Sequence, residues 1–282
     1  MIIGLIQVRM GSSRLPGKSL MDIHGKPMLW HLWKRVQNAK LLDRIVIATT
    51  TQPQDDQIAT FAAQHNIDCY RGSEMDIMTR LADATRTFGG TAFVRITGDC
   101  PLIDPALIDK TIAFHKEAPD FDIITNIFPP THPQGLSVEL ITLDAMDRAI
   151  NETSDPLWRE WATVYFYEHA RAGECGRSAP LSAEANATEG SNLPGYRIKN
   201  LEHPENLGHH RWTVDYEEDA MFMKAVFGAL GPAGEPFTMQ EILTYLEKHT
   251  EVYNLNRKFK RNEAFGEVLK EKGIESEWYK TQ

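Results

Sequence analysis

Short apolar stretches alternate with amphipathic stretches in the first half of the chain, and this order constrains the fold more than any other feature of the sequence. The apolar stretches lie at 2–8, 44–49, 67–70, 91–97 and 121–125. Patterns typical of helices separate them, at 28–39, 55–65, 76–88 and 105–117. Strands that alternate with helices in this way favour a mostly parallel sheet with helices on both faces. We therefore predict an α/β fold.

The pattern changes after residue 126. We expect a strand at 137–143, a Trp- and Tyr-rich helix at 157–170, a long loop at 173–195, and a strand at 211–216 before a helix at 217–230. These features predict a main domain of residues 1–250 with an insertion lobe at about 128–200, followed by a C-terminal helical extension at 251–282. The aromatic residues of the lobe suit a dimer surface and a local core equally well.

Composition excludes several classes of protein. Hydrophobic residues make up 42% of the chain, which argues against wholesale disorder. The 39 acidic residues outnumber the 30 Lys and Arg residues, and this balance argues against a general nucleic-acid binder. Three cysteines without a CxxC pair favour neither a disulfide framework nor a cysteine-rich zinc site. With no leader pattern and no long apolar run, we expect a cytoplasmic protein without membrane contact.

The loop that follows the first predicted strand is unusually cationic. It reads QVRMGSSRLPGKSL and places Arg9, Arg14 and Lys18 within ten positions. Ligands of open α/β sheets bind beyond the carboxyl ends of the strands, where this loop lies. Three cations on such a turn suit a polyphosphate, and a solvated surface loop is the alternative.

Small residues in the same loop support phosphate binding. Gly11 and Gly17 permit a close approach of backbone to phosphate, and Ser12 and Ser13 add hydroxyl and amide donors. The loop is not a Walker loop, because five residues rather than four separate its glycines. The dinucleotide fingerprint G-x-G-x-x-G is also missing from it. The loop therefore matches neither of these two motifs, and we expect it to bind a triphosphate in another way.

Five ordered segments resemble the cytidylyltransferase family, and its spore-coat-polysaccharide branch in particular: RMGSSRLPGK, IVIATT, YRGSEMDIMTRL, VRITGDCPLID and RWTVDYEED. That branch is related to the enzymes that make CMP-activated 3-deoxy-octulosonate and CMP-acylneuraminate. The resemblance implies a Rossmann-like, three-layer nucleotide-diphospho-sugar transferase fold. It further implies CTP as nucleotide donor, Mg²⁺ as cofactor, a small acidic acceptor and a homodimer.

Two distant aspartates match the metal-binding positions of this family. Asp99 follows the predicted strand at 91–97, and Asp215 lies in the strand predicted at 211–216. Mg²⁺ prefers one or two carboxylates together with phosphate oxygens and water. A helix cap or turn is the alternative role for each aspartate.

Other positions take roles from the resemblance or from their place in the predicted sheet. Thr49 ends one predicted strand and Arg71 follows another, and both are expected near the nucleotide, with a solvated loop arginine as the alternative for Arg71. Glu139 matches the acceptor side of the family pattern Gly-aliphatic-Asp-Val-Glu, in which Ser137 here replaces the acid. His210 is a candidate acceptor ligand, and a packing histidine is its alternative.

These residues suggest a hypothesis for the reaction. An acceptor hydroxyl attacks the α-phosphorus of CTP in line, and pyrophosphate leaves. In this hypothesis Arg14, Lys18 and Asp99 are the catalytic residues. A phosphorylated or phosphonate acceptor, or a nucleotide-sugar glycosyltransferase of the same fold, stays open.

Overall fold

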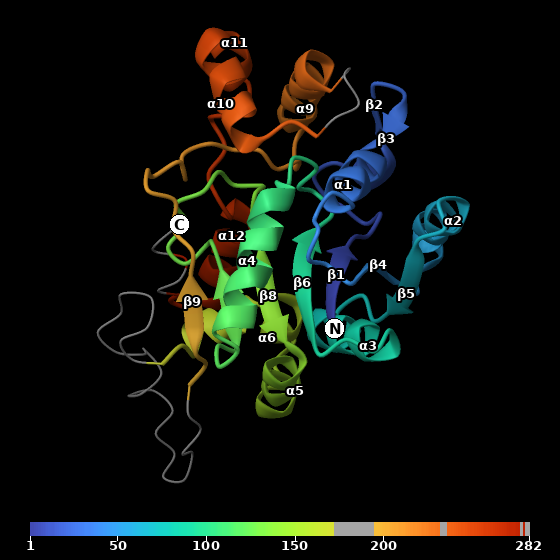
Figure 1. The fold of residues 1–282 in the computed structure, drawn as a ribbon, viewed down its shortest axis with the longest axis vertical. Coiled ribbons are helices and arrows are strands. Elements are labelled where there is room, and N and C mark those ends of the chain that lie inside the picture. The colour runs from blue at the N-terminus through green and yellow to red at the C-terminus, as the bar shows by residue number, and fades with distance from the viewer. Residues whose placement is uncertain (172–194, 232–235, 277–278, 280–282) are drawn as a thin grey trace.

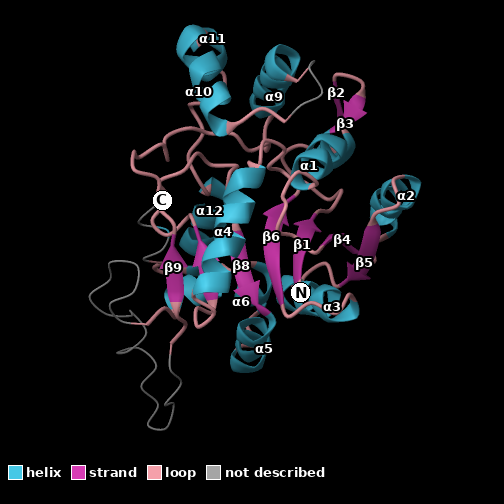
Figure 2. Cartoon of the chain, viewed as in Figure 1, coloured by secondary structure: helices cyan, strands magenta, loops and turns pink. Residues whose placement is uncertain are grey.

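A seven-stranded sheet forms the centre of the computed structural model, which describes residues 1–171, 195–231, 236–276 and 279. The strand order is β5-β4-β1-β6-β8-β7-β9 (Figures 1 and 2). The strands are β1 (Ile2–Gln7), β4 (Arg44–Thr50), β5 (Asp68–Gly72), β6 (Ala92–Thr97), β7 (Ile123–Thr125), β8 (Glu139–Thr142) and β9 (Ile198–Asn200). Only β8 runs antiparallel to its neighbours in this sheet, so the predicted α/β class with a mostly parallel sheet is confirmed.

Helices cover both faces of the sheet because successive side chains of a strand point to opposite faces. In β1, Ile3 and Leu5 join the apolar cluster under one set of helices, while Ile2 and Ile6 join the cluster under the other. The first set is α3 (Ile77–Thr87), α5 (Leu143–Glu152), α6 (Pro156–Glu160), α7 (Val164–Glu168) and α12 (Glu263–Lys272). The second set is α1 (Met28–Val36), α2 (Asp56–Gln64) and α4 (Pro105–Glu117).

A third apolar cluster lies beyond the end toward which β6 points (Figure 1). It joins α9 (Glu217–Leu230), α10 (Met239–Lys248) and α11 (Thr250–Tyr253) to the small hairpin of β2 (Asp22–Ile23) and β3 (Lys26–Pro27). A short 3-10 helix, η1 (Lys18–Leu20), precedes the hairpin, and a second, η2 (Pro53–Asp55), precedes α2. The cluster thus packs at the same edge of the sheet as the cationic loop.

The helix predicted at 157–170 is broken in the structure into α6 and α7. Trp161 leaves the helical conformation at φ −92° and ψ 50°, and its carbonyl accepts a hydrogen bond from the Val164 amide. The Trp161 ring packs against Phe265 of α12, with ring centroids 4.6 Å apart. This contact with a distant part of the chain is invisible in the local pattern, which is why the prediction of one helix was wrong.

The strand predicted at 211–216 is also wrong. This segment is extended, but it makes a single bridge between Gln134 and Arg211 rather than a ladder. The Val214 amide donates to the Asp99 carbonyl at 2.9 Å, which still brings the segment beside the end of β6. Asp215 therefore reaches the carboxyl edge of the sheet from a loop and not from a strand.

The segment 128–200 contributes β8 and β9 to the central sheet, and its division from the rest of the chain as a lobe stays a prediction. The loop predicted at 173–195 lies almost wholly outside the described residues. Across the part of the chain that the structure describes, every helix is too short or too polar to span a bilayer.

We expect Asp55→Ala to destabilise the protein by about 2–3 kcal/mol, because Asp55 is fully buried and accepts hydrogen bonds from the Met10 amide and the Thr50 hydroxyl. Chemical denaturation measures the change in free energy of unfolding. The matched control is Asp56→Ala, which removes the exposed partner of Arg71 and should cost less than about 1 kcal/mol. Equal losses in the two variants would contradict this account of the loop anchor.

Candidate active site

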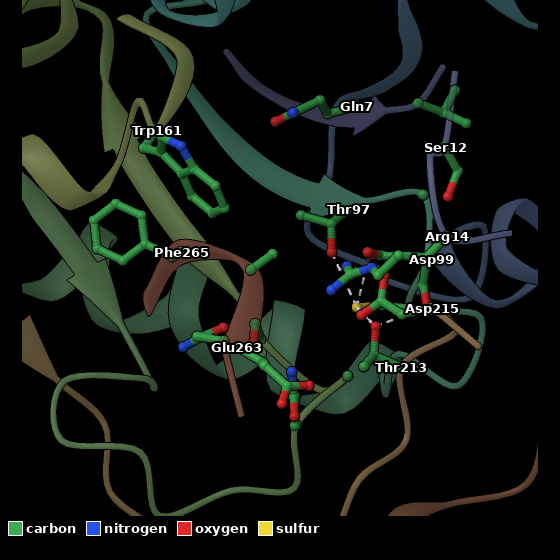
Figure 3. Close-up of a pocket in the computed structure, with 18 of the residues that line it drawn as sticks. Gln7, Ser12, Arg14, Thr97, Asp99, Trp161, Thr213, Asp215, Glu263 and Phe265 are labelled. Atoms are coloured by element: carbon green, nitrogen blue, oxygen red, sulfur yellow. Dashed lines mark hydrogen bonds and ion pairs between the residues drawn. The ribbon is translucent and has the colours of Figure 1, made fainter. Parts of the chain in front are cut away.

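A cleft of about 610 Å³ lies at the carboxyl edge of the sheet. The ends of β1 and β6 contribute Gln7 and Thr97 to its lining, and the loop after β1 contributes Arg9 and residues 11–14. Parallel neighbours end at the same edge of a sheet, so the loops that follow β1 and β6 necessarily converge there. Figure 3 shows Arg14, Asp99 and Asp215 on one side of this cleft and Trp161 and Phe265 on the other.

Lys18 lies between the two predicted aspartates. Its ammonium nitrogen is 2.9 Å from Oδ1 of Asp215 and 3.6 Å from Oδ2 of Asp99, and it donates to the Val214 carbonyl at 2.5 Å. Burial opposes the charge on Lys18, but the two carboxylates outweigh it and raise the pKa of the ammonium group. The structure thus brings together three residues that are up to 197 positions apart.

Asp215 is the most heavily paired carboxylate in the cleft. Arg14 approaches its Oδ1 at 2.7 Å, and Arg211 approaches its Oδ2 at 3.2 Å. Burial alone would raise the pKa of Asp215, but Lys18 and Arg14 lower it below its ordinary value. Arg211 is held in turn by the fully buried Asp219, at 2.8 Å. The result is a fixed cationic and acidic network at the base of the first loop.

The first loop owes its shape to particular backbone contacts. The Met10 amide donates to the buried carboxylate of Asp55 at 2.7 Å, and the Ser19 hydroxyl donates to the Arg9 carbonyl at 3.0 Å. Gly17 has φ +74°, a conformation that favours glycine, and it turns the chain into the 3-10 helix that carries Lys18. This turn aims the Lys18 side chain back into the cleft.

Polar groups from several elements line the rest of the cleft. Arg95 on β6 donates to Glu139 Oε2 at 2.5 Å, and the buried hydroxyl of Tyr167 donates to Glu139 Oε1 at 2.5 Å. Arg80 on α3 is only 2% exposed, yet no carboxylate lies within 4 Å of it among the described residues. Burial lowers the pKa of Arg80 to about 10, so its guanidinium remains charged at neutral pH.

The cleft contains most of the predicted site residues: Arg9, Gly11, Ser12, Ser13, Arg14, Lys18, Asp99, Glu139 and Asp215. It does not contain Thr49, Arg71 or His210. Thr49 is fully buried, and its hydroxyl has no hydrogen-bond partner among the described residues. Arg71 pairs with Asp56 at 2.7 Å and donates to two carbonyls of the β4 loop.

Sequence reasoning did not single out several residues that the cleft contains. Arg80 belongs to a motif that carries the family resemblance, but nothing in the pattern shows that its side chain faces a ligand. Arg211, a candidate ligand of the acceptor together with His209 and His210, does line the cleft. Residues 260–265 come from the C-terminal part of the chain, which has no local signal for a site. Trp161 is one of the aromatic residues of the segment 128–200, for which the sequence suggests a dimer surface or a local core, and it lies in the cleft wall.

The pair Asp99 and Asp215 has the chemistry of a magnesium site. Both carboxylates approach the same ammonium group, so their oxygens already converge on one position of positive charge. In the described residues, no group of three or more His, Cys, Asp or Glu side chains forms a closed metal site. Two hard oxygen donors beside an open cleft fit an ion that takes its other ligands from phosphate and water.

His210 packs between Trp212 and Tyr253 outside the cleft, with ring centroids 5.6 and 5.2 Å away. Burial lowers the pKa of His210 to about 4. Because the unfolded state binds the proton more readily, the stability that neutral His210 contributes is present above pH 6.5 and is lost as the pH falls toward 4.

We expect His210→Phe to reduce the drop in unfolding free energy between pH 6.5 and 4, measured by urea denaturation. An unchanged drop would contradict a packing role for this histidine.

The sequence is similar to a known protein family and to several known proteins. A family model described as "Cytidylyltransferase" matches residues 3–175. An uncharacterized protein of Methanocaldococcus jannaschii is 30% identical over 95% of this chain and 98% of its own length. The spore coat polysaccharide biosynthesis protein SpsF of Bacillus subtilis is 27% identical over 88% of this chain and 95% of its own length. A 3-deoxy-manno-octulosonate cytidylyltransferase of Geobacter sulfurreducens is 37% identical, but over only 42% of this chain and 46% of its own length.

Solved structures agree in fold. A cytidylyltransferase from Leptospira borgpetersenii superposes with a TM-score of 0.76 at 24% identity, covering 92% of this chain and 99% of that one. A CMP:2-keto-3-deoxy-manno-octonic acid synthetase in complex with CTP superposes with a TM-score of 0.58 at 16% identity, covering 81% and 98%. With the family model matching more than half of the sequence, the chain belongs to the cytidylyltransferase family, whose members are CTP-dependent nucleotidyltransferases.

Proposed function

We propose that the protein transfers CMP from CTP to an acidic sugar of the 3-deoxy-2-ulosonic or nonulosonic type and releases pyrophosphate. The observation that carries this proposal is the position of Lys18 between Asp99 and Asp215 in a cationic cleft. Eight Lys and Arg side chains line the cleft against six acidic ones, although the whole chain has a net charge of −9. The cleft therefore attracts anions locally.

The first loop is the part of the cleft suited to the triphosphate. Arg14 and Lys18 hold the β- and γ-phosphates and stabilise the charge of the departing pyrophosphate. Arg9 and the backbone of residues 11–13 orient the nucleotide. Catalysis of this kind depends on positioning and on neutralising charge, by analogy with phosphoryl transfer.

Asp99 and Asp215 are the residues that would hold the divalent cation. When bound, Mg²⁺ would supply Lewis-acid stabilisation of phosphate charge and a lower pKa for the acceptor hydroxyl. In the structure Lys18 and Arg14 neutralise Asp215 and lower its pKa, so Asp215 stays ionised before substrates arrive. The same cations are then available to phosphate oxygens a short distance away.

Arg80 supports an acidic acceptor. Its buried guanidinium lines the cleft without a carboxylate partner among the described residues. Burial lowers the pKa of Arg80 most, and the charges of Arg9 and Arg95 lower it further. The guanidinium donates to the carbonyls of Ser73 and Glu74, but its Nε has no hydrogen-bond partner among the described residues. An acceptor carboxylate in this part of the cleft would add the charged partner that Arg80 lacks. Glu139 neutralises Arg95 at 2.5 Å, whereas no carboxylate lies within 4 Å of Arg80 among the described residues.

The names of related proteins agree with this proposal. Several relatives are 3-deoxy-manno-octulosonate cytidylyltransferases, and the Bacillus subtilis relative is named for spore coat polysaccharide biosynthesis. We accordingly propose a role in surface polysaccharide biosynthesis, and the homodimer stays a prediction.

Ser137 favours a second candidate, a phosphorylated or phosphonate acceptor. It lines the cleft where the family pattern has an acid, and one acidic side chain fewer suits an acceptor with more negative charge.

The experiment that separates the candidates is a pyrophosphate-release screen with Mg²⁺. Four nucleoside triphosphates are paired with 3-deoxy-manno-octulosonate, N-acetylneuraminate and 2-aminoethylphosphonate. We expect release with CTP and a sugar acid; release with the phosphonate alone supports the second candidate, and none from CTP contradicts both.

We expect Lys18→Ala to lower kcat for CTP-dependent pyrophosphate release by roughly 100-fold or more, because a cation that stabilises the leaving group is lost. Steady-state kinetics with CTP and the best sugar acid measures the change. Lys26→Ala is the matched control, since Lys26 is an exposed cation on β3 outside the cleft. Near-normal turnover in Lys18→Ala would overturn the role assigned to this residue.

A further inference from the structure

Residues 260–265 and Glu267 form part of the cleft wall, although they lie beyond residues 3–175, which the family model matches. The chain that leads to this wall is anchored beside the aspartate network. The Asn256 side-chain amide donates to Asp219 at 2.9 Å, and the Phe259 ring stacks on Tyr216 with centroids 3.9 Å apart and an interplanar angle of 8°. The wall is therefore built into the site.

Trp161 stands at the break between α6 and α7 and forms the adjoining part of the wall. Its ring packs at 4.6 Å from Phe265, which is fully buried and fixes the indole in place. Among the described residues, the indole N–H of Trp161 has no hydrogen-bond acceptor, and its nitrogen is not fully buried. Figure 3 shows the indole across the cleft from Asp99 and Asp215. A rigid aromatic surface with a free donor thus faces the aspartate pair.

Glu263 adds a carboxylate to the same wall. It is half-buried and accepts one hydrogen bond, from the Tyr216 hydroxyl at 3.3 Å. No Lys or Arg group lies within 4 Å of its carboxylate in the described part of the chain, unlike Asp215 and Glu139 in the same cleft. A carboxylate has about four acceptor positions, so Glu263 retains capacity for donors from a ligand.

We propose that Trp161 and Glu263 bind the polyhydroxylated body of the acceptor and make the C-terminal segment the wall that selects a sugar. The apolar C–H face of a sugar ring packs on the indole, and ring hydroxyls donate to Glu263. Like charges repel, so the acceptor carboxylate lies away from Glu263 and toward Arg80. The inference rests on the proposed function and adds which side chains select a sugar ring over a small phosphonate.

The test compares kinetic constants for the two substrates, with whichever of 3-deoxy-manno-octulosonate and N-acetylneuraminate reacts faster. We expect Trp161→Ala to raise the acceptor KM by roughly tenfold or more, as for the loss of an aromatic contact of about 1.4 kcal/mol, while the CTP KM changes by less than about twofold. Trp161→Phe keeps an aromatic face, and it should recover most of this loss. Glu263→Gln should raise the acceptor KM about three- to tenfold.

Matched controls lie on the same elements. Trp158→Ala removes a partly buried indole from α6 that packs near Tyr165 and does not line the cleft. Glu271→Gln changes an exposed carboxylate on α12, also outside the cleft. Both variants should keep the acceptor KM within about twofold of the wild type. Tryptophan emission gives a second readout: the change on adding the sugar acid should persist in Trp158→Phe and vanish in Trp161→Phe.

The outcomes separate this inference from the proposed function. Calorimetry of the wild type with CTP tests the nucleotide site alone, and failure to bind CTP would remove the proposed function itself. If CTP binds, the inference is overturned when 2-aminoethylphosphonate is the only tested acceptor that reacts. It is also overturned if Trp161→Ala folds, as circular dichroism would show, and keeps the wild-type acceptor KM. A selective rise in the acceptor KM supports it.

Discussion

The ion pairs of Lys18 with Asp99 and Asp215 bring together three parts of the chain that lie far apart in the sequence. The first loop follows β1, Asp99 follows β6, and Asp215 lies just before α9. With 12% of its side chain exposed, Lys18 sits where an unpaired charge would be costly, so the two carboxylates and the ammonium group need one another. This mutual dependence fixes the distance between the first loop and the segment before α9, and the rest of the cleft is arranged around it.

The cleft has two chemically different sides. The side near the first loop is dense in cations that pair with aspartates, which suits a ligand whose several charges are partly neutralised by a metal. The other side presents the Trp161 and Phe265 rings, which suit the larger uncharged body of a ligand. An acidic chain can hold two anionic substrates in this way, because attraction at short range depends on local charge rather than on the net charge.

The sequence predicts those parts of the structure that depend on local pattern. The helix at 105–117 and the helix at 217–230 have the predicted bounds, because Asp104 caps one and acidic residues begin the other. It does not predict the position of Trp161 in the wall, since the break between α6 and α7 is stabilised by Phe265, about a hundred residues away. Arg71 lies outside the cleft for a similar reason: its carbonyl and Asp56 partners appear only once β4 and β5 pair. Convergence at the strand ends was predictable from topology, but the side chains that fill the far wall were not.

The account depends most directly on where CTP binds. A crystal structure of the protein soaked with CTP and Mn²⁺ would locate both the triphosphate and, from the anomalous signal, the metal. The account predicts phosphate oxygens in contact with Arg14 and Lys18 and a metal peak beside the carboxylates of Asp99 and Asp215. A triphosphate bound elsewhere, with Lys18 still enclosed by the two aspartates, would contradict it.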